Sequence, residues 1–482
     1  MSDLMSLVQR MEAFALGHAA RITSHRHVAI QPHALVLAPI VMAGEETDIH
    51  IAAVGRIGAP ARIRYVADPR RRDDLYARII SWLNRIVDPY FQWCLDHNTY
   101  PQLWVSSSAA AKLIDILSDR LRYARTPEAE RLGHLLTYSG ERQHHDGQQT
   151  LMAATRALRL HVATGQHVGE DEHLAALLTW IDPPLGVPIW DAVARAEGQP
   201  SGIKTDPAFD RLVLARLVQA YNKARRAHAA ASALDARAHA IGTALVPTVQ
   251  PIYHDIQRAI SFLHDLPCPD LPELSAFEKR ETAEFTYFMG HINKGGRLSR
   301  RDTIKRAAQG LTARKDAVEQ VAAAVRCSDR VARARSRLDG HIITGCIENL
   351  QRTREAPHRF RIEFDLVSTQ RILRARLGDE IYWADNPRLG VAVTSDQRTG
   401  GQARLHVVLT SGSRLFGHLS NGLVLDFTTD KPEWSRLVTD SVHISRVLAT
   451  PPWTHDQTPP PPPSPMSGPI PVDLLQALED LR

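Results

Sequence analysis

The sequence has few cysteines and no long apolar run, and each shortage excludes a class of protein. Four cysteines stand alone, outside any CxxC pair: Cys94, Cys268, Cys327 and Cys346. This spacing argues against a zinc ribbon or a thioredoxin-like site, and such sparse thiols are typical of a reducing compartment. The longest apolar run, residues 34–43, contains Pro39 and is too short for a membrane helix, which needs about twenty residues. We therefore expect a cytoplasmic protein without a membrane partner.

Known catalytic motifs are also missing. The sequence has no GxxxxGK[ST] loop to hold the phosphates of ATP and no GxSxG nucleophile elbow. Gly55 and Gly58 follow an expected strand but lack the third glycine of a dinucleotide-binding loop. These absences leave enzymatic activity undecided, with a non-enzymatic role favoured, and predict no organic cofactor.

Length and composition indicate a globular protein of several domains. The chain has 482 residues, of which 44% are hydrophobic and 23% charged, so it has enough apolar material for a core. At roughly 100–200 residues per domain, we expect two to four domains. The formal net charge of +5 permits a nucleic-acid partner without requiring one.

The first part of the chain, residues 1–198, is expected to form an α+β domain. Segments 35–42, 49–54 and 61–66 are β-like and are separated by glycine and proline, which predicts a small antiparallel sheet. Helical spacing of apolar residues predicts helices over 3–21, 75–93, 107–124, 127–138, 147–163 and 171–180.

Residues 203–355 are expected to form a long arm of antiparallel helices. An alanine-rich stretch over 205–240 predicts the first helix, which Pro247 and Pro251 should end. A second helix is expected over 301–355, with Gly340 as a candidate interruption. Four apolar residues in it are spaced by seven, as in a coiled coil: Ile304, Leu311, Val318 and Val325.

Residues 357–449 are expected to form a β-rich module. Phe360, Ile362 and Phe364 alternate with polar residues, and several short β-like segments follow, which together predict a small barrel or sandwich. The order of long helices and then a small barrel resembles the stalk-and-barrel insertion of some superfamily 1 helicases. The expected fold class is thus a multidomain, mainly α protein with a small N-terminal sheet and a C-terminal all-β module.

The end of the chain is expected to bind a protein partner. Residues 451–470 form a proline-rich linker, which is extended and cannot build a core. Residues 471–482 carry a helical stripe of leucines: Leu474, Leu475, Leu478 and Leu481. A helix this short is marginal alone in water, so we expect it to dock on a partner or, alternatively, on its own chain.

Basic residues are concentrated in the second arm helix. Between residues 294 and 337, thirteen basic residues stand against four acidic ones, a local charge of +9. A basic face of this kind binds phosphate backbones, although an ordinary solvated surface is the alternative. The candidate nucleic-acid contacts in the arm are Arg300, Arg301, Lys305, Arg326, Arg330, Arg333, Arg335 and Arg337. In the β module we add Arg361 and Trp383, although packing in a barrel core is the favoured role of Trp383.

Histidine clusters offer a different interpretation. His144, His145 and Asp146 resemble the histidine–aspartate doublet of HD phosphohydrolases, which implies a divalent metal that activates water. The simpler reading is a polar turn in which Asp146 caps a helix. A second patch contains His25, His27 and His33, and there too a structural role is favoured.

These observations support one leading hypothesis and two alternatives. The leading hypothesis is a non-enzymatic accessory protein or adaptor that binds DNA or RNA through the arm and the β module and recruits a partner through its C-terminal helix. The alternatives are a metal-dependent, HD-like hydrolase and a protein scaffold. The leading hypothesis depends on positive charge being gathered on one side of the arm and not neutralised by carboxylates.

Overall fold

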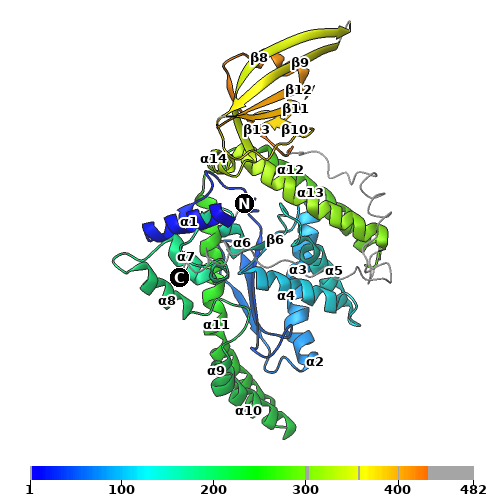
Figure 1. The fold of residues 1–482 in the computed structure, drawn as a ribbon. Helices are drawn as coiled ribbons and strands as arrows, with labels where there is room; N and C mark the ends of the chain where they lie inside the picture. Colours follow the sequence, from blue (N-terminus) through cyan, green and yellow to red (C-terminus); the bar gives the residue numbers. More distant parts are fainter. Residues whose placement is uncertain (1–2, 299–302, 357–358, 400, 432–482) are drawn as a thin grey trace, which may run out of the picture. The chain divides into compact units, whose positions relative to one another are not determined.

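The structure is a computed structural model that describes residues 3–298, 303–356, 359–399 and 401–431 (Figure 1). Residues 1–298 and 314–436 belong to one compact unit. The second unit comprises residues 299–313 and 437–482, and little of it lies in the described part of the chain. The following description therefore concerns the first unit.

The expected fold class is confirmed, since the chain is mainly helical with an N-terminal sheet and a C-terminal closed barrel. The helices before residue 299 are α1 (Asp3–Leu16), α2 (Arg72–Leu75), α3 (Ser81–Asp96), α4 (Ser108–Leu121), α5 (Pro127–Arg142), α6 (Ala154–Arg159), α7 (Leu174–Ile181), α8 (Ile189–Glu197), α9 (Pro207–Phe209), α10 (Ala215–Arg226), α11 (Ala231–Asp265) and α12 (Pro272–Asn293). They are followed by α13 (Ile304–Ser328) and α14 (Arg330–Leu338).

The N-terminal sheet has five strands in the order β4-β3-β2-β5-β6. Its strands are β2 (Leu35–Val41), β3 (Ile49–Arg56), β4 (Arg62–Tyr65), β5 (Leu103–Val105) and β6 (Leu151–Ala153). The first three pair antiparallel, as the sequence predicts, whereas β5 and β6 extend the sheet in parallel beside β2. The antiparallel sheet expected from the first three segments is confirmed, and two parallel strands that were not predicted extend it. The helix expected over 147–163 is reduced to α6. β5 and β6 have three residues each, which is too short to show the alternation of apolar and polar residues that indicates a strand.

Helices cover both faces of this sheet. One core lies between the sheet and α3, α4, α5 and α12, and it includes Phe91, Leu132 and Phe285. The other core lies between the sheet and α6, α7 and α11, and it includes Trp104 and Ile256. Two further strands, β1 (Ala20–Arg21) and β7 (Val162–Ala163), pair as a separate small sheet.

The longest described helix, α11, contains both prolines that were expected to end it. Pro247 and Pro251 lie inside its 35 residues. An interior proline costs about 3 kcal/mol. The helix buries Leu245, Val249 and Ile256 against the sheet, and this burial outweighs the cost of the two interior prolines.

The helix expected to continue to residue 355 ends before residue 340, which is a second correction. Gly340 has φ +79°, and a Cβ there would meet the carbonyl oxygen of Ile372 at 2.8 Å, so the chain leaves α14 at a glycine. The strand β8 (Ile342–Ala356) follows directly. It begins with Ile342, Ile343 and Thr344, whose β-branched side chains favour a strand.

The C-terminal module is a closed barrel of six strands in the order β10-β11-β12-β9-β8-β13. The strands after β8 are β9 (Arg359–Ser368), β10 (Glu380–Trp383), β11 (Gly390–Thr399), β12 (Gln402–Ser411) and β13 (Val424–Thr428). The alternation expected around Phe364 is confirmed, because Ile362, Phe364 and Leu366 are buried in the barrel core. No helix among the described residues is long and apolar enough to cross a bilayer.

Candidate nucleic-acid interface

Several arginines of the arm are neutralised by carboxylates. Arg333 Nη1 lies 2.5 Å from Asp385 Oδ1, and Arg337 Nη2 lies 2.7 Å from Asp426 Oδ2. Both carboxylates belong to the barrel module, Asp426 in β13 and Asp385 just after β10. The buried Arg326 forms an ion pair with Asp430. These guanidiniums attach the helices to the barrel, so their charge is not free for phosphate.

The remaining arm candidates differ in their surroundings. Arg335 donates to the carbonyl oxygen of Arg21 at 3.3 Å, whereas Arg330 is exposed to solvent. Arg300 and Arg301 fall outside the described residues, as does the side chain of Lys305. The coiled-coil pairing of α13 stays a prediction, and Val318 of its apolar row is half exposed.

Trp383 packs against the barrel core. It is partly buried beside the apolar cluster formed by Ile343, Phe364 and their neighbours, and its indole Nε1 is buried. The alternative reading of Trp383 as a core residue therefore describes its position better than base stacking does.

A basic two-stranded ribbon extends beyond the barrel. We call residues 351–356 of β8 and 359–362 of β9 the basic ribbon. Among the described residues, β12 pairs only with residues 363–368 of β9, and β13 only with residues 342–346 of β8, so the two strands of the basic ribbon pair with β8 and β9 alone. In Figure 1 these two strands continue past the other barrel strands. The ribbon starts where the register shifts between Glu348 and Gln351, with Asn349 at φ +53°.

The basic ribbon is positively charged, and its Arg352, Arg354 and Arg361 side chains are exposed. Residues 351–362 contain four arginines and one glutamate, a net charge of +3. Strand register places Arg352 and Arg354 on one face with Phe360, and Arg361 on the other face. Phe360 is 42% exposed. The guanidinium carbon of Arg352 lies 3.9 Å from the centroid of the Phe360 ring.

Other barrel arginines form ion pairs within the barrel. Arg404 contacts Glu348 at 2.7 Å and Asp365 at 2.9 Å. In the ribbon itself, Arg361 Nε lies 2.7 Å from Glu363 Oε2. Within residues 351–362 arginines outnumber acids by four to one.

The predicted metal residues His144, His145 and Asp146 do not form a ligand group in the described part of the chain. Asp146 Oδ1 forms an ion pair with Arg156 at 2.5 Å. Burial, together with the neighbouring charges of Arg142 and Arg314, lowers the pKa of His145 to about 4. His145 and Asp146 instead line a cavity.

This cavity has a volume of about 460 Å³, which suits a small molecule. Its wall combines apolar side chains of α13 and β6, such as Val321 and Leu151, with polar groups of other elements. His27, His145 and Arg335 are among the polar residues. Residues of the two predicted histidine patches thus line one cavity, which the sequence order does not suggest.

Sequence reasoning missed Arg352, Arg354 and the exposed ring of Phe360. The first two were assigned to a helix, and Phe360 was assigned only to an alternating strand. The density of arginine over residues 352–361 was the available signal. The predicted docking leucines, from Leu474 to Leu481, lie outside the described residues.

Comparison with known proteins gives no relative. No family model, no curated protein and no solved structure matches the chain.

Proposed function

We propose that the chain is a nucleic-acid-associated accessory protein that contacts DNA or RNA mainly through the basic ribbon and recruits a protein partner through its C-terminal segment. The observation that carries this proposal is a segment with a sequence charge of +3 in which the exposed Arg352 and Arg354 share one face with the exposed ring of Phe360. Arginine forks bind phosphate oxygens, and bases stack on aromatic rings and on guanidinium planes.

The geometry of the ribbon suits this role better than the arm does. A two-stranded β-ribbon is narrow enough to follow a nucleic-acid groove. Arg352 lies against Phe360 and also 5.2 Å from the centroid of Phe416, so its guanidinium plane is held between two rings. An arginine held in this way loses little side-chain entropy when it contacts a phosphate or a base.

Removing the ribbon arginines should weaken binding and flatten its salt dependence. Each lost phosphate contact lowers the slope of log affinity against log salt by about 0.7–0.9. The triple variant Arg352→Ala, Arg354→Ala, Arg361→Ala should therefore flatten the slope by about two. Fluorescence anisotropy with labelled single-stranded and duplex oligonucleotides, over a salt series, measures both quantities.

A matched control removes the same charge elsewhere. Arg78, Arg85 and Arg195 are exposed residues of the N-terminal part, and their triple alanine variant should bind nearly as the unchanged chain does. Equal losses in the two variants would mean that only total charge matters and would contradict the proposed contact. A chain ending at Thr450 should keep its affinity for nucleic acid, since the C-terminal segment is assigned to a protein partner.

A further inference from the structure

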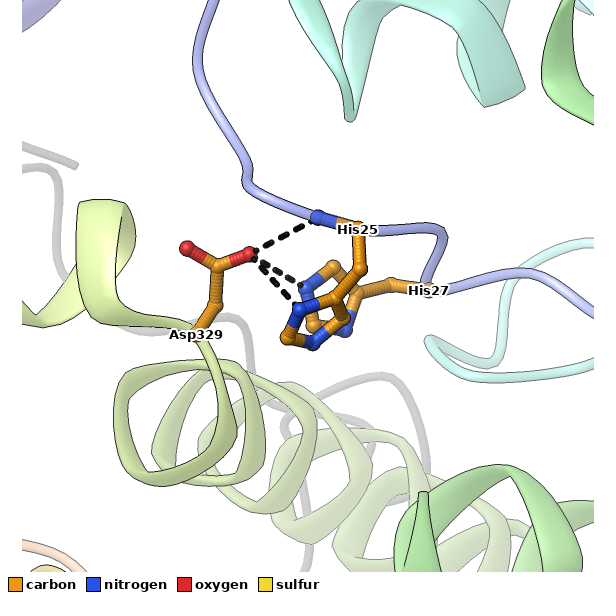
Figure 2. A group of neighbouring side chains, drawn as sticks. All are labelled: His25, His27 and Asp329. Atoms are coloured by element: carbon orange, nitrogen blue, oxygen red, sulfur yellow. Dashed lines mark hydrogen bonds and ion pairs between the residues drawn. The ribbon is translucent and has the colours of Figure 1, made fainter. Parts of the chain in front are cut away.

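Two histidines and one aspartate from distant parts of the chain meet in a buried cluster (Figure 2). His25 and His27 lie in the segment between β1 and β2, and Asp329 lies between α13 and α14. His27 Nε2 is 3.3 Å from Asp329 Oδ2, and His25 Nδ1 is 3.6 Å from the same oxygen. All three residues are buried. Their ligand atoms lie within 4.8 Å of one another.

These separations suit a bound transition metal. Zinc bonds to nitrogen and oxygen are about 2.0–2.2 Å long, so neighbouring ligands in a tetrahedral site lie roughly 3.3–3.6 Å apart. The two distances to Asp329 Oδ2 fall in this range. Two imidazoles and a carboxylate are also the donor types that zinc and related first-row metals bind.

A second carboxylate lies behind His27. Glu273 at the start of α12 is 1% exposed, and its Oε1 lies 3.8 Å from His27 Nδ1. Within the described residues, neither oxygen of Glu273 has a hydrogen-bond partner, and His27 Nδ1 has none either. A buried carboxylate without hydrogen-bond partners destabilises the folded state unless positive charge lies nearby. If Nε2 of His27 binds a metal, Nδ1 carries the proton and faces Glu273, an arrangement common among metal-binding histidines.

Neighbouring groups hold the cluster in position. The backbone N–H of His27 donates to His161 Nε2 at 2.9 Å, and the other nitrogen of His161 lies 2.7 Å from the carbonyl oxygen of Ala157. Ser24 donates to Asp329 Oδ2 from its N–H at 2.6 Å and from its hydroxyl at 2.8 Å. Asp329 Oδ1 accepts from the first turn of α14. Ligands restrained in this way need little rearrangement to bind an ion.

A metal-free cluster is the alternative. A protonated His27 between Asp329 and Glu273 would satisfy both carboxylates. In that arrangement the Nδ1 of the buried His25 ring contacts Ser24 Oγ at 3.2 Å and lies 3.6 Å from Asp329 Oδ2, while its Nε2 has no hydrogen-bond partner in the described residues.

We propose that His25, His27 and Asp329 bind one first-row transition metal ion, with zinc as the expected ion and Glu273 as the hydrogen-bond acceptor of His27. Three protein ligands leave one tetrahedral position for water or another ligand. His27 also lines the cavity of about 460 Å³, so the cluster borders that cavity. This site is separate from the basic ribbon and does not depend on nucleic-acid binding.

The test uses the full-length chain after treatment with a chelator. Titration with Zn²⁺ in a calorimeter should give one ion per chain, and Co²⁺ should give the intense visible absorption of a tetrahedral site. Zinc should also raise the thermal unfolding midpoint, because an ion that binds only the folded state stabilises it.

Conservative variants separate metal binding from folding. Asp329→Asn keeps a helix-capping side chain but loses the charge. Asp329→Asn and His27→Gln should each lower zinc affinity by more than a hundredfold and abolish the cobalt absorption. Glu273→Gln should lower the affinity by about 10–100-fold, as loss of an outer hydrogen-bond partner does.

His33→Gln is the matched control, because His33 belongs to the same sequence patch but lies outside the cluster. It should bind zinc as the unchanged chain does. The proposal is overturned if the folded chain gives no cobalt absorption, or if His27→Gln binds zinc as tightly as the unchanged chain and His33→Gln do.

Discussion

Replacing Arg142 by alanine should lower the free energy of unfolding by about 3–5 kcal/mol, as removal of one partner from a buried ion pair does. Arg142 at the end of α5 contacts Glu281 of α12 at 2.7 Å and also pairs with Glu284. The carboxylate of Glu281 is fully buried, and the substitution leaves it with two longer contacts, to Arg280 and to the hydroxyl of Tyr138, each at 3.5 Å. This pair connects two helices that pack on one face of the N-terminal sheet.

Urea denaturation followed by circular dichroism measures this effect. Arg85→Ala on the exposed surface of α3 is the control and should change stability by less than about 0.5 kcal/mol. The double variant Arg142→Met, Glu281→Leu should recover most of the loss, because apolar replacement of a buried pair is often neutral. If Arg142→Ala is as stable as Arg85→Ala, the ion pair does not hold α5 to α12.

Acidification should destabilise the fold through two buried neutral histidines. Burial lowers the pKa of both His50 and His161 to about 4 from an ordinary value of 6.5. The unfolded chain therefore binds more protons than the folded chain below pH 6.5, and stability falls as the pH decreases from 6.5 toward 4. The loss approaches about 3 kcal/mol per group near pH 4. For His161 the cause is also geometric, since its Nε2 accepts the N–H of His27 and cannot take a proton without losing that bond.

The variants His50→Gln and His161→Gln should each make stability less dependent on pH between 6.5 and 4. Unfolding by urea at a series of pH values, with a chelator present, measures the slope. His264→Gln is the control, because the His264 side chain is 74% exposed. If the slopes of all three variants match that of the unchanged chain, these two histidines are not the groups that titrate.

Much of the fold follows from local patterns, and the failures have specific causes. The alternation around Phe364 predicts β9 because one face of that strand fills the barrel core. Residues 348–352, by contrast, include several good helix formers and no proline, and they lie in a strand because β9 pairs with Glu348, Gln351 and Arg352. In α11, tertiary packing likewise outweighs the helix-breaking effect of two interior prolines.

The candidate sites depend on contacts that sequence order does not reveal. The carboxylates that neutralise the arm, Asp385 and Asp426, follow Arg333 by 52 residues or more, and no periodic pattern links them. The histidine pair at His25 and His27 is visible in the sequence, but its partner Asp329 is 302 residues from His27. Clusters of like residues can thus be predicted, whereas the partners that set their chemistry cannot.

Photochemical crosslinking tests the proposed contact of the basic ribbon most directly. A photoreactive phenylalanine analogue in place of Phe360 would report nucleic acid within reach of the ribbon face. The same analogue in place of Tyr287, an aromatic residue of α12 that is 83% exposed, is the control. We predict crosslinks to a bound oligonucleotide from position 360 and few from position 287. Equal yields from the two positions, or none from position 360 while the protein binds the oligonucleotide, would contradict the proposal.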